Sequence, residues 1–184
     1  MGSLVTRPAS DRPDLLAPPV VQALSSWAER DHVSVAEIDP SYADTATFCE
    51  RYGVPRSAAA NCVVVSGSRG GNERIAACVV SAETRADVNN TVRHTLEVRR
   101  ASFLPVDRAV AESGMEYGGI TPMGLPDSWR LLVAPEVAAI EVAVIGSGVR
   151  GSKLLLPGRL LAALPGAEIV AGLARRPGCD RTPG

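Results

Sequence analysis

The clearest chemical feature of the chain is a short stretch, Gly114–Pro126, that could bind a ligand through its backbone alone. It contains four glycines and two prolines. Gly118 and Gly119 can adopt backbone angles closed to other residues, and they let another molecule approach the main chain. Pro122 fixes its own φ and pushes Thr121 towards an extended conformation. The stretch therefore predicts a stiff, exposed loop whose fixed N–H and C=O groups could bind carbonyl oxygens, anions or amines, although a purely structural double turn is the alternative interpretation.

The side chains of the usual catalytic sets do not accompany this loop. The sequence has no G-x-S-x-G elbow and no H-E-x-x-H pattern. His32 and His94 lack a matching nucleophile or carboxylate context, so we interpret them as helix-end or surface residues. The four cysteines have no C-x-x-C spacing, and Cys62 and Cys78 lie in apolar patterns typical of core strands. We therefore expect neither a metal ion nor a cofactor.

The composition of the chain indicates the class of protein to which the loop belongs. A chain of 184 residues with 46% apolar and 21% charged residues is typical of one soluble domain, and 4% aromatic residues predict an aliphatic core. The formal charge is −1, so any contact with nucleic acid would have to be local. The sequence has no signal peptide and no apolar run near the ~18 residues of a membrane span, so we expect a cytoplasmic protein with no membrane partner.

Apolar periodicity predicts the elements that hold the loop in place. Helices are expected over residues 18–27, 43–52, 87–96, 105–113 and 157–164, with a short helical turn at 135–137. Strands are expected over residues 33–38, 61–65, 74–80, 99–103, 128–133, 141–145, 153–156 and 168–173. The continuous run 61–65 is typical of a strand buried on both faces. Paired strands with helices between them indicate a single mixed α/β (α+β) domain over residues 14–174, with a flexible arm at 1–13 and a flexible tail at 175–184.

Two motifs resemble one known family. Residues Glu116–Pro126 resemble the glycine-rich loop of the YbaK/ProX family, and Gly119–Pro122 supplies its G-x-x-P signature. Residues Val144–Gly151 are similar to the family's late strand and to the Ser/Gly/Arg turn that follows it. The resemblance extends over residues 33–173 and implies a mixed, barrel-like curved β-sheet flanked by helices.

The resemblance also implies an activity. The family consists of aminoacyl-tRNA deacylase (editing) domains, free-standing or inserted in prolyl-tRNA synthetases, that clear amino acids from mischarged tRNA. It implies a trans-acting hydrolase of the aminoacyl ester that needs no cofactor and uses a backbone loop and a water positioned by the substrate. The implied partners are the acceptor end of aminoacyl-tRNA and an aminoacyl-tRNA synthetase. The implied aminoacyl site has two walls, formed by Gly118, Gly119, Ile120, Thr121 and Pro122 on one side and by Ser147, Gly148 and Arg150 on the other.

One position departs from the family pattern. The family usually carries a lysine at the start of the central strand, where it contacts the terminal phosphate of the tRNA, and the resemblance places Asn61 there. Asparagine can hydrogen-bond a phosphate but carries no charge. Lys153, the only lysine of the chain, lies just past the Ser147–Gly151 turn, where the family often has an acidic residue. We hypothesise that Lys153 supplies the missing cation from the opposite wall; a solvated strand residue is the alternative interpretation.

Other interpretations stay open at this point. The substitution at Asn61 favours a catalytically inactive binding or regulatory module, and a neutral cleft mouth would favour a hydrolase of another small acyl ester. Arginines near the loop could form a local basic rim or could be scattered over the surface; they are Arg93, Arg99, Arg100, Arg108 and Arg130.

Overall fold

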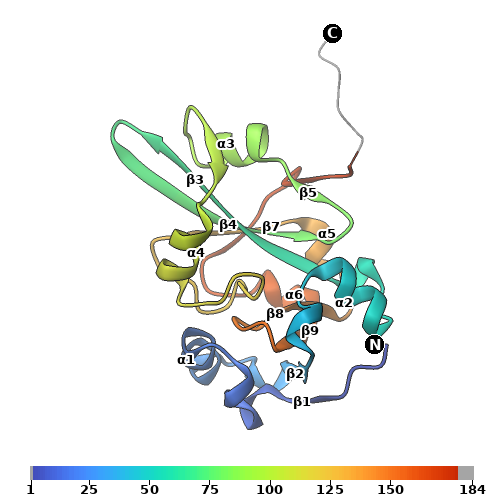
Figure 1. Cartoon of the computed structure of the whole chain (residues 1–184). Coiled ribbons are helices and arrows are strands. Elements are labelled where there is room, and N and C mark those ends of the chain that lie inside the picture. Colours follow the sequence, from blue (N-terminus) through green and yellow to red (C-terminus); the bar gives the residue numbers. More distant parts are fainter. Residues whose placement is uncertain (1, 178–184) are drawn as a thin grey trace.

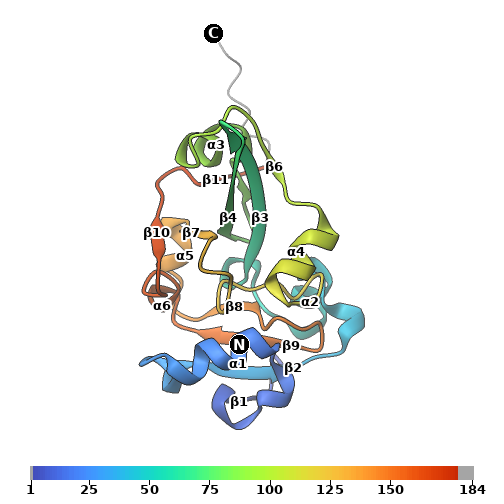
Figure 2. The same ribbon diagram turned by 90° about the vertical axis from the view of Figure 1, so that its left-hand side faces the viewer.

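The computed structural model describes residues 2–177, which form two larger β-sheets and a small third one (Figure 1, Figure 2). The first sheet is antiparallel, with the strand order β1 (Thr6–Pro8), β2 (Ser34–Glu37), β9 (Ser152–Leu156) and β8 (Ala143–Gly146). The second sheet has the strand order β10 (Ala167–Ile169), β7 (Arg130–Val133), β4 (Asn72–Ser81), β3 (Ala60–Arg69) and β6 (Ala101–Phe103). In this sheet β7 runs parallel to both β4 and β10, and the other pairs are antiparallel. The third sheet pairs β5 (Arg85–Ala86) with β11 (Ala174–Arg175).

The helices are short and lie between strands. They are α1 (Pro18–Ser26), α2 (Thr45–Tyr52), α3 (Arg93–Thr95), α4 (Val106–Ser113), α5 (Pro135–Ala138) and α6 (Gly158–Leu161). A π-helical segment, Val88–Val92, precedes α3. Single 3₁₀ turns lie at Ala9–Asp11, Pro13–Leu15, Arg30–His32, Pro40–Tyr42 and Arg56–Ala58.

The two helices that flank the candidate loop in space begin and end where local signals predict. The carboxylate of Asp44 accepts hydrogen bonds from the N–H groups of Ala46 and Thr47, which caps the N-terminus of α2. Gly53 follows α2 with a φ of 65°, and Gly114 follows α4 with a φ of 66°. Both glycines adopt the left-handed conformation that commonly ends a helix. These ends confirm the helix ends expected at residues 52 and 113.

The β3–β4 hairpin is longer than predicted. The strands pair from Ala60 opposite Ser81 to Arg69 opposite Asn72. Gly70 and Gly71 alone connect the two strands. Both have a positive φ (59° and 83°), and two consecutive residues of positive φ form the tight turn that is typical of a two-residue hairpin. Residues 66–69 and 72–73, which lie between the two strands expected from the sequence, therefore continue those strands.

The start of β3 is also less buried than predicted. Val64 and Val65 are buried, but Asn61, Cys62 and Val63 are only half-buried. The prediction that this strand is buried on both faces is therefore wrong for its first half. The physical reason is the cleft described below, which opens beside these three residues.

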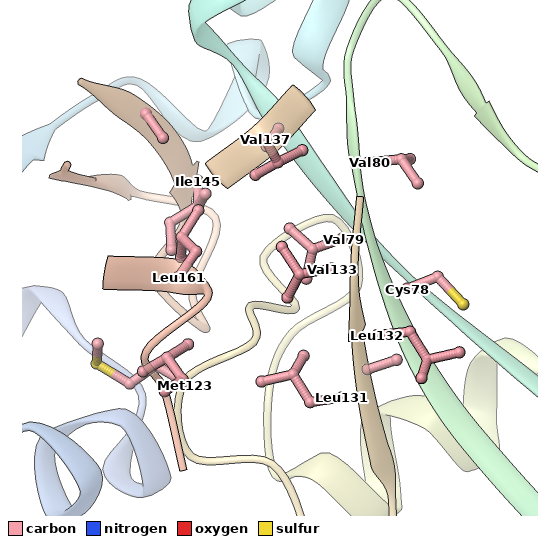
Figure 3. Packing of buried hydrophobic residues seen from close by; sticks show 14 of the residues in the cluster. Cys78, Val79, Val80, Met123, Leu131, Leu132, Val133, Val137, Ile145 and Leu161 are labelled. Carbon is pink, nitrogen blue, oxygen red and sulfur yellow. The ribbon is translucent and has the colours of Figure 1, made fainter. Parts of the chain in front are cut away.

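The main core lies between the two larger sheets and is aliphatic, as expected. Figure 3 shows Val79 and Val133 of the second sheet on one side of this core, with Ile145 of the first sheet and Leu161 of α6 on the other. Met123, from the end of the glycine-rich loop, is 2% exposed and packs into the same cluster. The loop is therefore anchored in the core on its C-terminal side.

A single mixed α/β domain is confirmed, but a barrel is not seen. Within residues 2–177 both larger sheets are open, and the link between them is an isolated bridge from Ala59 to Val144. The expected flexible arm at residues 1–13 also differs from the structure. Thr6–Pro8 forms β1 at the edge of the first sheet, and Ala9 is fully buried, because this segment completes the sheet beside β2.

The C-terminal prediction differs in its first residues. Arg175, the first residue of the expected flexible tail, lies in β11, and its guanidinium is 2.7 Å from the carboxylate of Asp87. The remainder of that expected tail, residues 178–184, lies outside the described part of the chain. Among the described helices, none has the length and apolar character needed to cross a membrane.

Candidate functional site

A cleft of about 590 Å³ lies between the start of α2, the first half of β3, α4, the glycine-rich loop and the β8–β9 hairpin. Figure 2 shows α2 and α4 on the same side of the molecule. Half of the residues predicted for the site line the cleft; they are Asn61, Gly118, Ile120, Arg150 and Lys153. The fold thus brings the loop, the lysine and the asparagine to one cavity.

The glycine-rich loop is fixed against the turn that follows β8. The N–H of Gly148 donates to the carbonyl of Gly119 (2.8 Å), and the N–H of Glu116 donates to the carbonyl of Gly148 (2.8 Å). Gly119 has no room for a side chain, since a Cβ there would lie 2.8 Å from the carbonyl carbon and oxygen of Val149. A Cβ at Gly146 would collide with the Gly119 carbonyl. The two motifs found in the sequence are therefore in direct contact, backbone against backbone.

The loop presents two N–H groups that its own structure does not use. The N–H groups of Gly118 and Ile120 have no hydrogen-bond partner within residues 2–177, and both residues line the cleft. Gly118 has a φ of 81°, a conformation that favours glycine. The N–H of Gly119, between them, donates to the carbonyl of Glu116 (2.9 Å). Fixed backbone donors of this kind can stabilise negative charge that develops on a carbonyl oxygen.

Lys153 is buried in the wall of the cleft. The residue is 7% exposed, and its ammonium lies 2.9 Å from the carbonyl oxygen of Ala43 and 5.3 Å from the ring centroid of Phe48. Burial lowers the pKa of Lys153, and the negative charge of Asp44 acts in the opposite direction. The alternative interpretation of a solvated strand residue is therefore wrong. An ammonium has three N–H donors, so Lys153 has further donors besides the one that binds Ala43.

Asn61 and Lys153 both reach the segment that starts α2. The hydroxyl of Thr45 donates to the Oδ1 atom of Asn61 (2.6 Å), while Lys153 donates to Ala43, two residues earlier. The two side chains come from different sheets, since Asn61 is on β3 and Lys153 is on β9. Asn61, at the position where the family usually has a lysine, and Lys153 therefore lie at the same end of the cleft.

Arg150 connects the loop to a distant turn. Its guanidinium donates to the carbonyls of Pro40 (3.0 Å) and Tyr117 (3.3 Å), and its backbone N–H donates to the carboxylate of Glu116 (2.6 Å). These bonds hold the backbone of Tyr117 immediately before Gly118. Arg150 therefore positions the loop at the mouth of the cleft.

The other predicted residues lie behind the cleft. Gly119 and Gly148 make the loop–turn contact, and Ser147 is fully buried, with its hydroxyl bonded to the hydroxyl of Ser152 (2.7 Å). Thr121 is also fully buried, and its Oγ1 has no partner among residues 2–177. Pro122 faces a separate cavity on the α1 side of the molecule. These residues support the loop from outside the cleft.

Several lining residues were not identified from the sequence. Thr45 and Phe48 come from α2, and an acidic residue before a helical pattern is a recognisable cap signal that could have drawn attention to this segment. Phe103 and Tyr117 also line the cleft, and no periodic pattern distinguishes them from core aromatics. Cys62 lines it too, and burial raises the pKa of its thiol, so the sulfur is held as a neutral thiol rather than a thiolate.

Of the two interpretations left open for the arginines near the loop, the local basic rim is not seen at the cleft. Arg108 lies between the carboxylates of Glu73 (2.8 Å) and Glu112 (2.7 Å), and Arg130 binds Glu168 (2.6 Å). None of the five arginines named for the rim lines the cleft. Within residues 2–177 there is also no group of three or more histidine, cysteine or acidic side chains that could hold a metal ion.

A comparison of the sequence with known families identifies the type of domain. The sequence profile described as the aminoacyl-tRNA editing domain matches residues 39–164. No curated protein shows significant sequence similarity to the chain.

Solved structures share the fold. A protein proposed to be a trans-editing enzyme for prolyl-tRNA synthetase is 17% identical with a TM-score of 0.71, over 84% of this chain and 94% of that one. A hypothetical protein is 18% identical with a TM-score of 0.68, over 77% of this chain and 90% of that one. A protein from Marinobacter aquaeolei VT8, proposed to act in signal transduction, is 18% identical with a TM-score of 0.51, over 83% of this chain and 30% of that one. At these identities the similarity shows the fold alone.

Proposed function

Because the chain belongs to the aminoacyl-tRNA editing domain family, we propose that it is a trans-acting deacylase that hydrolyses the ester bond of mischarged aminoacyl-tRNA. Its partner in the reaction is the acceptor end of the charged tRNA, in the cytoplasm, and an aminoacyl-tRNA synthetase is a second partner in the same pathway of tRNA charging. The observation that carries the proposal is the pair of unused N–H groups, at Gly118 and Ile120, in a cleft that also holds a buried lysine.

In the proposed reaction the backbone supplies the main catalytic contribution. A water oxygen attacks the carbonyl carbon of the aminoacyl ester, and the carbonyl oxygen becomes negatively charged. The N–H groups of Gly118 and Ile120 stabilise this oxyanion, a type of interaction whose loss commonly costs about 10²–10³ in rate. The carbon–oxygen bond to the ribose then breaks, the ribose oxygen takes up the proton that the attacking water gives up, and the free amino acid and the tRNA leave. The neighbouring ribose hydroxyl of the substrate orients the water, so no acid–base side chain of the protein is needed.

Lys153 has the proposed role of holding the terminal phosphate of the tRNA. An ammonium with donors to spare can make charge-assisted hydrogen bonds to phosphate oxygens. Asn61 lines the same end of the cleft, and its amide can donate to the same group. Arg56 also lines the cleft and is exposed, which adds positive charge there. These contacts would replace the phosphate contact that the family lysine makes.

A deacylation assay tests the proposal. The purified protein is incubated with tRNA charged with alanine, serine, cysteine or proline, and loss of the ester is compared with a buffer control. We expect turnover of at least one charged tRNA, and a strong loss of turnover in Lys153→Ala. Arg159→Ala, which removes an exposed cation on α6 away from the cleft, should retain wild-type turnover.

A second candidate function is favoured by the uncharged residue at position 61. A folded protein that binds charged tRNA but hydrolyses none of the four esters would be a binding or regulatory module rather than a deacylase. Hydrolysis of a small acyl ester without any preference for tRNA would instead indicate a hydrolase of another substrate.

A further inference from the structure

Among residues 2–177, most of the large hydrophobic side chains that are exposed line the cleft. Within the described residues, the large hydrophobic side chains that are exposed are Val5, Phe103, Val106, Tyr117 and Ile169. Three of these five line the cleft, including Phe103 at 62% exposure and Tyr117 at 63%. Single exposed hydrophobic residues are common, but a group of them around one cavity indicates an interaction site.

Rigid backbone presents both rings. Phe103 is the last residue of β6 and pairs with Val65 in the second sheet, and the next residue, Leu104, donates its N–H to the carbonyl of Val64 (2.9 Å). The carbonyl of Tyr117 accepts a hydrogen bond from the Arg150 guanidinium (3.3 Å). The rings are therefore held out towards solvent by fixed main chain, and their exposure is a feature of the fold.

The charge of the cleft favours an anionic partner. The lining includes three cationic side chains, those of Arg56, Arg150 and Lys153, and one acidic side chain, that of Asp44. The carboxylate of Asp44 is already used to cap α2. The cleft is thus positive although the whole chain has a formal charge of −1. Exposed aromatic faces beside a positive groove are the combination that binds unpaired nucleotides.

We propose that Tyr117 and Phe103 are stacking platforms for unpaired nucleobases at the 3′ end of the substrate tRNA. This inference rests on the proposed function, because it takes the acceptor end as the ligand of the cleft. Tyr117 directly precedes Gly118, so their Cα atoms are ~3.8 Å apart. A base stacked on Tyr117 would therefore lie next to the loop N–H groups that bind the ester carbonyl. The terminal nucleotide must lie there, because its ribose carries the ester. Phe103, on the β6 side of the cleft, takes a neighbouring unpaired base.

Kinetics with two substrates test the stacking. Phe103→Ala and Tyr117→Ala should each raise KM for charged tRNA by roughly 5- to 150-fold, the range expected for loss of one base–aromatic stack, with little change in kcat. Hydrolysis of a 3′-O-aminoacyl ribose, which keeps the neighbouring hydroxyl but has no base, should be unchanged. Tyr117→Phe and Phe103→Trp keep the aromatic face and should retain the wild-type KM. Ile169→Ala, which removes an exposed apolar side chain of β10 outside the cleft, is the matched control.

Binding without turnover separates this inference from the proposed function. The probes are an RNA hairpin with an unpaired 3′ tail and the same hairpin with a blunt end. Wild-type protein should prefer the tailed hairpin, and Phe103→Ala and Tyr117→Ala should lose that preference, even if no ester is hydrolysed. Equal binding of the two hairpins by wild-type protein would overturn the stacking inference while leaving the deacylase assay to decide the activity. An equal loss of aminoacyl-ribose hydrolysis and aminoacyl-tRNA hydrolysis in the alanine variants would also overturn it, because the rings would then act on the loop itself.

Discussion

Replacing Gly119 with alanine tests whether the contact between the loop and the turn after β8 positions the cleft. A Cβ at Gly119 would lie 2.8 Å from the carbonyl carbon and oxygen of Val149, whereas ordinary contacts are 3.4–4 Å. The shortfall between 2.8 and 3.4 Å is about 0.6 Å, and the obstacle is backbone, so the loop or the turn must move by at least that much. Gly119 has no positive φ, so alanine adds crowding there without backbone strain.

The expected effects of Gly119→Ala are separable. The free energy of unfolding should fall by about 1–3 kcal/mol, the usual cost of overpacking. The kcat for deacylation should fall by roughly 10- to 100-fold, because displacement of a catalytic group by ~1 Å commonly costs about 10²-fold in rate. Urea denaturation measures the first effect, and single-turnover deacylation measures the second. Gly146→Ala introduces a collision with the same loop from the other side, and the double variant should lose less than the sum of the two single losses, since both act on one contact.

Gly166→Ala is the matched control. Gly166 has a φ of 73° and no atom within 4 Å of a Cβ built on it, so alanine adds backbone strain alone. We expect a loss of about 1–2 kcal/mol of stability and wild-type deacylation. Wild-type kcat in a folded Gly119→Ala protein would refute the reasoning, and so would an equal loss of kcat in Gly166→Ala.

Two buried charges give further predictions. Lys153→Met should abolish the phosphate contact, yet it should not lower the free energy of unfolding at pH 7, because burial of the ammonium disfavours the charged form. The lowered pKa of Lys153 means that wild-type stability relative to the Met variant should rise as the pH increases through that pKa towards the ordinary lysine value; urea denaturation at neutral and high pH checks this. Asp87→Asn should lower the free energy of unfolding by about 1–3 kcal/mol at pH 7. Burial alone would raise the pKa of Asp87, but hydrogen bonds from Thr91 and Asn90 and the charge of Arg175 outweigh burial and lower the pKa. That contribution is present above the ordinary aspartate pKa and is lost as the pH falls through the lowered one, so acid titrations of the two proteins should converge at low pH.

The parts of the fold encoded by local signals could be predicted from the sequence. Gly53 and Gly114 end their helices because each adopts a φ that other residues avoid, and this requirement is visible at the residue itself. The hairpin between β8 and β9 also agrees with the strands expected over residues 141–145 and 153–156, and the turn within it contacts the glycine-rich loop.

The parts that depend on distant pairing could not be predicted. Thr6–Pro8 is polar and follows no strand pattern, yet it pairs with β2 because that edge is otherwise open. The burial of Lys153 depends on a segment more than a hundred residues earlier in the chain, where the carbonyl of Ala43, just before α2, and the ring of Phe48 in α2 lie close to the ammonium. The exposure of Phe103 and Tyr117 could not be predicted either. Alternation of apolar and polar residues indicates which face of a strand is buried, but it does not indicate which residues line a cavity.

Lys153 and Asn61 are connected through the residues at the start of α2, so substitutions at the two positions should affect activity together. Asn61 accepts a hydrogen bond from Thr45, and Lys153 donates one to Ala43, so both side chains reach the same short segment from different sheets. A lysine introduced at position 61 alone would bring a second ammonium to a place where one is already buried, and an aspartate at position 153 alone would face Asp44 without a cation. We therefore expect Asn61→Lys and Lys153→Asp each to impair deacylation, and the double variant to recover activity towards the wild-type level. Deacylation kinetics of the three variants measure this coupling. Additive losses in the double variant would show that the two positions act independently and that Lys153 does not replace a cation at position 61.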